Sequence, residues 1–402
     1  MDPAAALTRL GELTTTDSRE LDRVCEEVAA ALHQAGAEPL FTLAGADFAT
    51  DPYLICADRY WRLRFLELPT IRTALACAAW LRTHLAAGHR AEVEQRWALG
   101  YAFVTKDSVE SRRELDEAAT DFAGSADLSF FAAVYHAGKL RANFCFDELE
   151  DFLSASLLAQ AAGRHREDPV FLALRCFAAY GSRRIATAHA AELLERAWSH
   201  PRRSRQVVDL CLNALAAAKP FPGDGTLLRE RAEEAVELWP RDHIFHFRLA
   251  TGRSMCGAHE AALDSVDQAL ALLPATGTRG SHKLLQEQYL VLRNEIRSAL
   301  TRAAAEAHTA RRWEAQEAAN RELTRKLETS TMSTVTVLTL FGTVISFVLT
   351  SVPLAYAGTL PLTSRLALLA AQAAALLLFA ALTITATHLL HRRRTRPTTG
   401  ER

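Results

Sequence analysis

The stretch HIFHFRLATGRSMCGAHEAALDSVDQALALLP, residues 243–274, contains the clearest structural pattern in this chain. Apolar residues recur at helical spacing in its first half and again in its second half, with Gly257 between the halves and Pro274 at the end. A spacing of three and four residues places such side chains on one face of a helix. Glycine and proline at these two positions are typical of helix ends. The stretch therefore predicts two helices joined by a short turn.

The same pattern returns twice upstream at a nearly constant interval. Its small and apolar positions in the last copy are Leu249, Ala250, Ala262, Val266 and Ala269. The matching positions 34 residues earlier are Leu215, Ala216, Ala235 and Pro240. A further 38 residues earlier they are Phe177, Ala178, Ala190, Leu194 and Ala197, with Pro201 one place early. Self-similarity at such a period is the signature of a repeat architecture.

On these residues the chain resembles the tetratricopeptide repeat (TPR) family, whose 34-residue units are helix-turn-helix pairs with small residues where the two helices cross. The segment KPFPGDG, 219–225, departs from the family by lengthening one internal turn. The resemblance implies an all-α fold, a TPR-like α-solenoid over residues 166–275, whose first helices line a surface for a protein or peptide partner.

The resemblance also suggests where such a partner would bind. In family members that capture a C-terminal carboxylate, Lys, Asn and Arg occupy set groove positions, but the corresponding places in the last unit here are Phe247 and Thr251. We therefore expect a groove of mixed apolar and polar character, with Phe247 and Thr251 as its candidate protein-binding residues.

Residues 1–165 also show helical spacing, without a fixed period. The predicted helix pairs are 51–68 with 70–88, 91–104 with 108–124, and 128–144 with 147–163. Gly100 and Ala137 are the small residues that we expect at the helix crossings of the last two pairs. This part is predicted to be an irregular helical-repeat region.

A polar break follows Pro274, and residues 281–329 then predict one long stalk helix with a coiled-coil-like seam. The seam residues are Leu285, Tyr289, Leu292, Ile296, Ala299 and Ala303. A seam of this kind suits either a helix that packs back on the last repeat or a coiled coil between copies of the chain. The sequence leaves both alternatives open.

No charged residue lies between Glu328 and Arg365, and the segment 366–390 is again almost wholly apolar. About 20 apolar residues are enough to cross a bilayer. Helices that are apolar all round are not typical of a soluble surface. We therefore predict two transmembrane helices, 332–357 and 366–390, joined by a short loop into a hairpin.

Basic residues flank both outer ends of this hairpin. Arg321, Arg325 and Lys326 precede it, and Arg392, Arg393, Arg394 and Arg396 follow it. The connecting loop has only Arg365. The positive-inside rule then places both chain ends in the cytoplasm, with 391–402 as a basic cytoplasmic tail. An N-terminus with early acidic residues and no apolar segment does not match a signal peptide. The predicted location is the inner membrane of a bacterial cell, with two spans.

Small and hydroxylated residues on the first span allow close helix contact in lipid. The candidate membrane-packing residues are Thr339, Gly342, Thr343 and Ser346. A homo-oligomer could therefore form through contacts between hairpins. It could also form through the stalk seam, on the helix before the hairpin.

Composition and motifs argue against several other functions. A net charge of −1 gives no general attraction for nucleic acid. The sequence has no phosphate-binding glycine loop, no zinc-protease motif and no nucleophile elbow, and its seven cysteines form no C-x-x-C pair. We predict no enzyme activity, no cofactor and no metal.

Two functions fit these features. The first is a membrane-anchored cytoplasmic scaffold that recruits or holds partner proteins at the bilayer. The alternative rests on architecture alone: repeat proteins with a C-terminal two-span hairpin resemble membrane proteins of bacterial conflict or antiphage systems. In that case the hairpin would oligomerise on activation and perturb the membrane.

Overall fold

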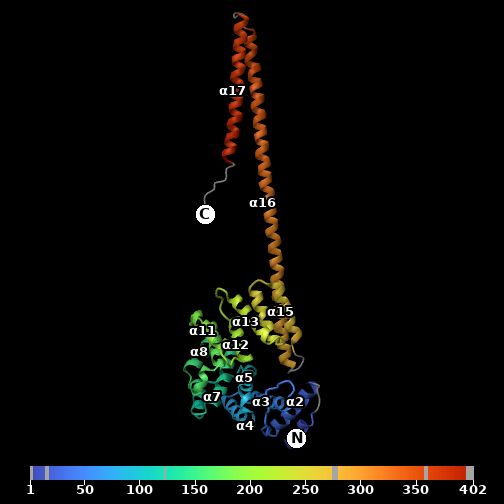
Figure 1. The fold of residues 1–402 in the computed structure, drawn as a ribbon, viewed down its shortest axis with the longest axis vertical. Helices are drawn as coiled ribbons and strands as arrows, with labels where there is room; N and C mark the ends of the chain where they lie inside the picture. The colour runs from blue at the N-terminus through green and yellow to red at the C-terminus, as the bar shows by residue number, and fades with distance from the viewer. Residues whose placement is uncertain (1–2, 14–17, 122–123, 274–278, 357–360, 395–402) are drawn as a thin grey trace. The chain divides into compact units, whose positions relative to one another are not determined.

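The computed structural model describes residues 3–13, 18–121, 124–273, 279–356 and 361–394, and these are helical throughout apart from turns and loops (Figure 1). A single isolated parallel β-bridge joins Leu43 to Leu85, and the described residues form no β-strand. The expected all-α class is confirmed.

Sixteen short and medium helical elements precede the two long C-terminal helices within the described residues. They are α1 (Pro3–Gly11), α2 (Ser18–Gln34), α3 (Pro52–Glu67), α4 (Ile71–His84), α5 (Ala87–Val104), α6 (Arg112–Asp121), α7 (Ala126–Ala142), α8 (Phe146–Ala155), α9 (Leu157–Ala161), the 3-10 helix η1 (Gly163–Glu167), α10 (Pro169–Gly181), α11 (Thr187–Trp198), α12 (Arg205–Ala216), α13 (Asp224–Leu238), α14 (His243–Met255) and α15 (His259–Leu272). The long helices are α16 (Arg279–Tyr356) and α17 (Leu362–Arg394).

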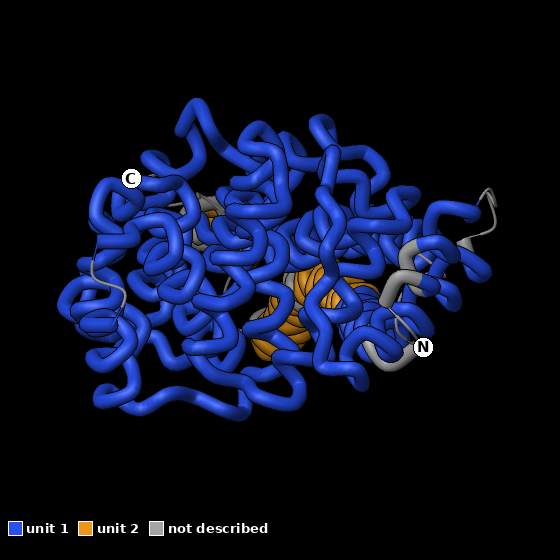
Figure 2. The backbone as a smooth tube through the Cα atoms, turned by 90° about the horizontal axis from the view of Figure 1, so that it is seen from below, with its two compact units in different colours: residues 1–301 blue, residues 302–402 orange. Residues whose placement is uncertain are grey.

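The chain divides into two compact units, residues 1–301 and 302–402, which Figure 2 draws in separate colours. Helix α16 belongs to both, because its first residues pack in the first unit and the rest lies in the second. The predicted stalk and first span are thus parts of one helix.

In the first unit, neighbouring helices pack side by side along the chain. Helix α14 packs against both α13 and α15, and α10 packs against both α11 and α12. The small residues Ala250, Ala262 and Ala269 are fully buried in α14 and α15. A Cβ added at Gly252 would lie 2.7 Å from the backbone nitrogen of Arg229 in α13. The small residues in this segment therefore allow the close helix approach that the sequence predicts.

Replacing Ala250 by leucine tests this packing. Because the site is fully enclosed, the larger side chain has no space, and we expect the free energy of unfolding to fall by about 1–3 kcal/mol. Ala310 is exposed on α16, so Ala310→Leu is the matched control and should change little. Chemical denaturation of both variants, followed by circular dichroism in detergent, measures the difference. Equal losses would contradict the helix crossing at Ala250.

The crossing predicted at Gly100 is wrong. Gly100 is exposed, and a Cβ added there would meet no atom within 4 Å. Helices α5 and α7 approach each other instead at Gly138, where an added Cβ would lie 2.7 Å from the Cβ of Ala102. Gly100 lies on the opposite, solvent-facing side of α5, and without a fixed period the sequence did not reveal which side faces α7. Ala137 is buried, as expected.

The start of α16 packs back on the last helix pair. Tyr289 is 1% exposed and stacks on Phe247 with 4.6 Å between ring centroids. Arg293 donates to Asp267 in α15 at 2.5 Å. Residues 301–327 of the same helix are all exposed. The beginning of the helix therefore packs back on the last helix pair, as one of the two stalk alternatives predicts. A coiled coil between copies of the chain stays a prediction for the exposed part.

The second unit contains two helices that are long and apolar enough to cross a membrane, at Thr334–Pro353 and Leu362–Ala386. They lie side by side in Figure 1, and the Gln372 amide donates a hydrogen bond to the Thr350 hydroxyl across the pair. Gly358 of the predicted turn and the tail residues 395–402 lie outside the described residues. The hairpin is thus consistent with membrane association by length and composition.

Candidate protein-binding surface

Polar side chains from three separate helices of the first unit lie near one another at a place that we call the arginine face: Arg141, Asp209, Asn213 and Arg248. The Arg248 guanidinium in α14 donates to the Asn213 side-chain oxygen in α12 at 3.0 Å. Its Nη2 also lies 4.0 Å from Oδ1 of Asp209. Arg141 at the end of α7 is close enough for its protonation to depend on both Asp209 and Arg248.

Burial dominates the electrostatics of these groups. It lowers the pKa of Arg141 and of Arg248, and the nearby Asp209 carboxylate opposes that effect in both. Two guanidinium groups facing a single carboxylate leave a local excess of positive charge. Such an excess inside a partly desolvated surface favours an anionic or strongly accepting partner.

The arginine face also has unused hydrogen-bonding capacity. The Nε atoms of Arg141 and Arg248 and Oδ1 of Asp209 are buried and have no hydrogen-bond partner. Leaving a buried polar group unpaired costs about 1–3 kcal/mol. The packing of these helices therefore leaves both guanidinium groups only partly satisfied.

Nearby, Arg205 and Asp242 form an ion pair in which both carboxylate oxygens have a donor. Arg205 in α12 donates to both carboxylate oxygens of Asp242, at 2.7 and 3.1 Å. Burial alone would raise the pKa of Asp242, but the bonds from Arg205 outweigh it and lower that pKa. Asp242 also accepts from the backbone of Ile244 and so caps α14. This pair fixes α14 against α12 and has little left to offer a ligand.

The predicted groove residues both lie on α14, beside the arginine face. Phe247 is half-buried, with one ring face on Tyr289 and the guanidinium of Arg248 5.6 Å from its centroid. The Thr251 hydroxyl donates to the backbone oxygen of Phe247 at 3.1 Å. Their role in binding stays a prediction.

Sequence reasoning missed the arginine face because its members come from α7, α12 and α14, which are far apart in sequence. Only the adjacency of Arg248 to Phe247 gave a local signal. The arginine face forms only through the packing of these helices.

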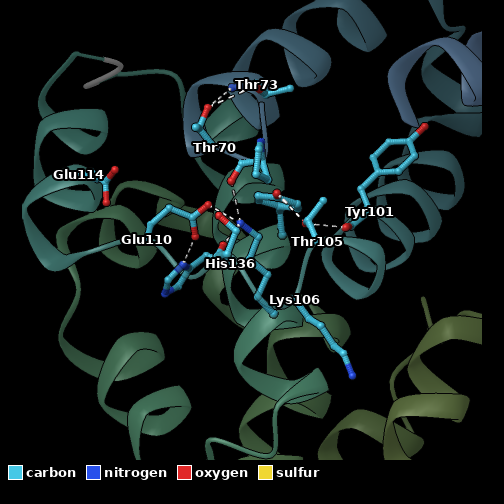
Figure 3. A network of polar contacts seen from close by, with 12 residues as sticks. Thr70, Thr73, Tyr101, Thr105, Lys106, Glu110, Glu114 and His136 are labelled. Atoms are coloured by element: carbon cyan, nitrogen blue, oxygen red, sulfur yellow. Dashed lines mark hydrogen bonds and ion pairs between the residues drawn. The ribbon is translucent and has the colours of Figure 1, made fainter. Parts of the chain in front are cut away.

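A second polar cluster, drawn in Figure 3, is buried around Lys139 and His136. The ammonium of Lys139 in α7 is fully buried and donates to Glu110 Oε1 at 2.5 Å, to the Ser108 oxygen at 2.6 Å and to the Pro69 oxygen at 3.0 Å. The other Glu110 oxygen is bonded to His136 Nδ1 at 2.7 Å. All three ammonium protons therefore have acceptors, and the cluster ties two loops to α7 rather than presenting a reactive group.

Glu94 in α5 provides a pH-dependent prediction. It is 8% exposed, and burial raises its pKa to about 8. The folded protein then holds a proton that the unfolded chain loses near pH 4.5, so stability falls as the pH rises from about 5 to 8, by up to about 1.4 kcal/mol per pH unit. In Glu94→Gln this decline should be reduced and stability at pH 8 should rise. Thermal unfolding across that range measures it, and identical pH profiles would contradict the assignment.

In the first span, the four candidate packing residues divide into two kinds. The hydroxyls of Thr339 and Thr343 donate back to the backbone oxygens of Val335 and Thr339. Gly342 and Ser346 are exposed, and a Cβ added at Gly342 would meet no atom within 4 Å. Gly342 is therefore free of contacts with α17 in the single chain, and contact with another helix in lipid stays a prediction.

Neither a protein-family model nor a curated protein matches this chain. Among solved structures, the crystal structure of yeast Tom70 is similar at 12% sequence identity and a TM-score of 0.36, over 74% of this chain and 58% of that one. The chain thus spans less than two thirds of that protein. A likeness of this size establishes neither a common fold nor a common function.

Proposed function

We propose that this protein is a membrane-anchored scaffold, whose first unit binds a partner protein and whose hairpin keeps the complex at a bilayer. The observation that carries the proposal is the arginine face, where the partly exposed guanidinium groups of Arg141 and Arg248 lie on stacked helices. Stacked helix pairs provide extended surfaces for such recognition. The two apolar helices of the second unit support the anchoring part.

The chemistry of the arginine face points to the kind of partner. Arg141 and Arg248 share one carboxylate, so the surface favours an acidic segment of the partner, with Phe247 offering an apolar contact beside it. Guanidinium groups bind carboxylates with two parallel hydrogen bonds, which adds specificity to charge attraction. Binding should therefore weaken as salt concentration rises.

Partner binding is tested by in vivo photo-crosslinking from position 251, comparing Arg248→Gln with Arg112→Gln. Arg112 is almost fully exposed and makes only a surface ion pair, so it serves as the matched control. We expect the crosslinked partner to be lost or reduced about tenfold with Arg248→Gln, because a charged hydrogen bond contributes about 1.5–3 kcal/mol. Crosslinks that are the same in both variants would contradict binding at the arginine face.

We further propose that both chain ends lie in the cytoplasm of a bacterial cell, with the hairpin in the inner membrane. The support is the distribution of basic residues, with Arg321, Arg325 and Lys326 before the first span and only Arg365 at the start of the second. Reporter fusions after Gly280 and after Arg402 should both read as cytoplasmic. A periplasmic signal at either point would contradict the two-span topology.

A second candidate function is favoured by one observation on the hairpin. Because Gly342 has open space around its Cβ position, a second hairpin could approach α16 closely there. This is the property that a membrane-perturbing effector of a conflict system would need.

A further inference from the structure

A cavity of about 350 Å³ lies apart from the arginine face, between η1, α8 and α10. Three arginines line it: Arg164 and Arg166 from η1, and Arg175 from α10. Leu153 and Phe171 form its apolar floor, and both are almost fully buried. Small-molecule sites in proteins combine an apolar wall with a few polar groups and occupy about 300–1,000 Å³.

Two of these arginines keep unused donors. Arg175 has one ion pair, to Glu150, at the long distance of 3.8 Å between Nη2 and Oε1. Its Nε is buried with no hydrogen-bond partner. The Arg166 side chain is exposed and makes no hydrogen bond or ion pair within the part of the chain that the structure describes. The cavity therefore presents guanidinium groups that a ligand could engage.

The acids around the cavity are already engaged elsewhere. Asp127 accepts from Arg164 at 3.2 Å and also bonds His165 at 2.7 Å. Glu167, the one acid in the lining, accepts from Arg196 at 2.6 Å. With these carboxylates paired and Glu150 beside Arg175, Arg166 is the charge of the lining that has no ion-pair partner among the described residues. The cavity as a whole is cationic.

We propose that this cavity binds a small molecule that carries a phosphate group. The planar, multi-donor guanidinium group matches phosphate oxygens. Arg166 offers a charge with no ion-pair partner among the described residues, and Arg175 offers an Nε donor without an acceptor. The apolar floor of Leu153 and Phe171 would contact a compact organic part. A volume near 350 Å³ suits a small molecule rather than a folded partner.

Calorimetric titration of the full chain in detergent tests the proposal with three probes: inorganic phosphate, phenyl phosphate and benzoate. Phenyl phosphate should bind most tightly, because it offers both the dianion and an apolar ring. Inorganic phosphate binding equally well would still support phosphate recognition and would assign the site to the free ion. Benzoate binding as tightly as phenyl phosphate, or no binding by either phosphate probe at millimolar concentration, would overturn the proposal.

Variants then locate the binding. Arg166→Gln changes an exposed residue and should leave folding intact while weakening phenyl phosphate binding about tenfold or more, and Arg175→Gln should do the same. Arg113→Gln is the matched control, because Arg113 is 86% exposed and pairs only with Glu117 on the surface. The control should leave the affinity unchanged. Equal affinities in Arg166→Gln and Arg113→Gln would show that the probe does not use this cavity.

Discussion

Lys139→Met should lower the free energy of unfolding by about 3–5 kcal/mol, the cost of breaking a buried ion pair by removing one partner. Methionine has a similar shape and no charge. It would leave the Glu110 carboxylate, whose side chain is 4% exposed, without its ammonium partner. The backbone oxygens of Ser108 and Pro69 would lose their donor at the same time. The loops that hold these residues would therefore be tied less firmly to α7, although the bond between Glu110 and His136 remains.

A double-mutant cycle shows whether the loss comes from the ion pair. Combining Lys139→Met with Glu110→Gln removes both charges, so the double variant should be more stable than the sum of the two single losses predicts, by about 0.5–3 kcal/mol. Lys283→Met is the control, because Lys283 is 76% exposed. Urea denaturation of the full chain in detergent gives the four free energies. Additive losses, or a loss under 1 kcal/mol for Lys139→Met, would mean that the cluster is not a coupled unit.

Helical periodicity explains what could be predicted from this sequence. The positions of α14 and α15 followed from local spacing, since Gly257 and Pro274 bound the segments and Ala250 and Ala269 mark the tight contact. The two apolar helices of the second unit followed from length and composition alone. Each of these features is encoded within a few consecutive turns of chain.

Contacts between distant segments could not be predicted in the same way. Glu110 lies in a loop with no pattern, and nothing in the sequence relates it to Lys139 in α7. The sequence around Arg141 and around Arg248 contains no recognisable motif. Only the stacking of the helices brings these two residues near Asp209. At Gly100 the irregular spacing did not show which face of α5 meets α7. Pairing of buried charges is a property of the packed structure, and a single sequence carries no signal for it.

Exchange of the hairpin should separate the scaffold from the effector. If the two spans only raise the local concentration of the first unit at the bilayer, replacing residues 332–394 by an unrelated two-span anchor of the same orientation should leave partner recruitment unchanged. An effector hairpin acts through its own surface, so the exchange should abolish the membrane permeability that the protein causes. Recruitment is measured by crosslinking and permeability by dye uptake into cells.

Gly342→Leu is a more specific test of the same question, because a Cβ added at Gly342 meets no atom of its own chain within 4 Å beyond the backbone of its own helix. The substitution should leave the α16–α17 hairpin intact and block only the approach of a second hairpin. Ala380→Leu is the contrasting variant, since Ala380 in α17 is 6% exposed and a larger side chain would overpack the hairpin itself. For a scaffold we expect full recruitment and no dye uptake with Gly342→Leu. Dye uptake in the wild type that disappears in both the anchor exchange and Gly342→Leu would instead establish the effector and overturn the scaffold.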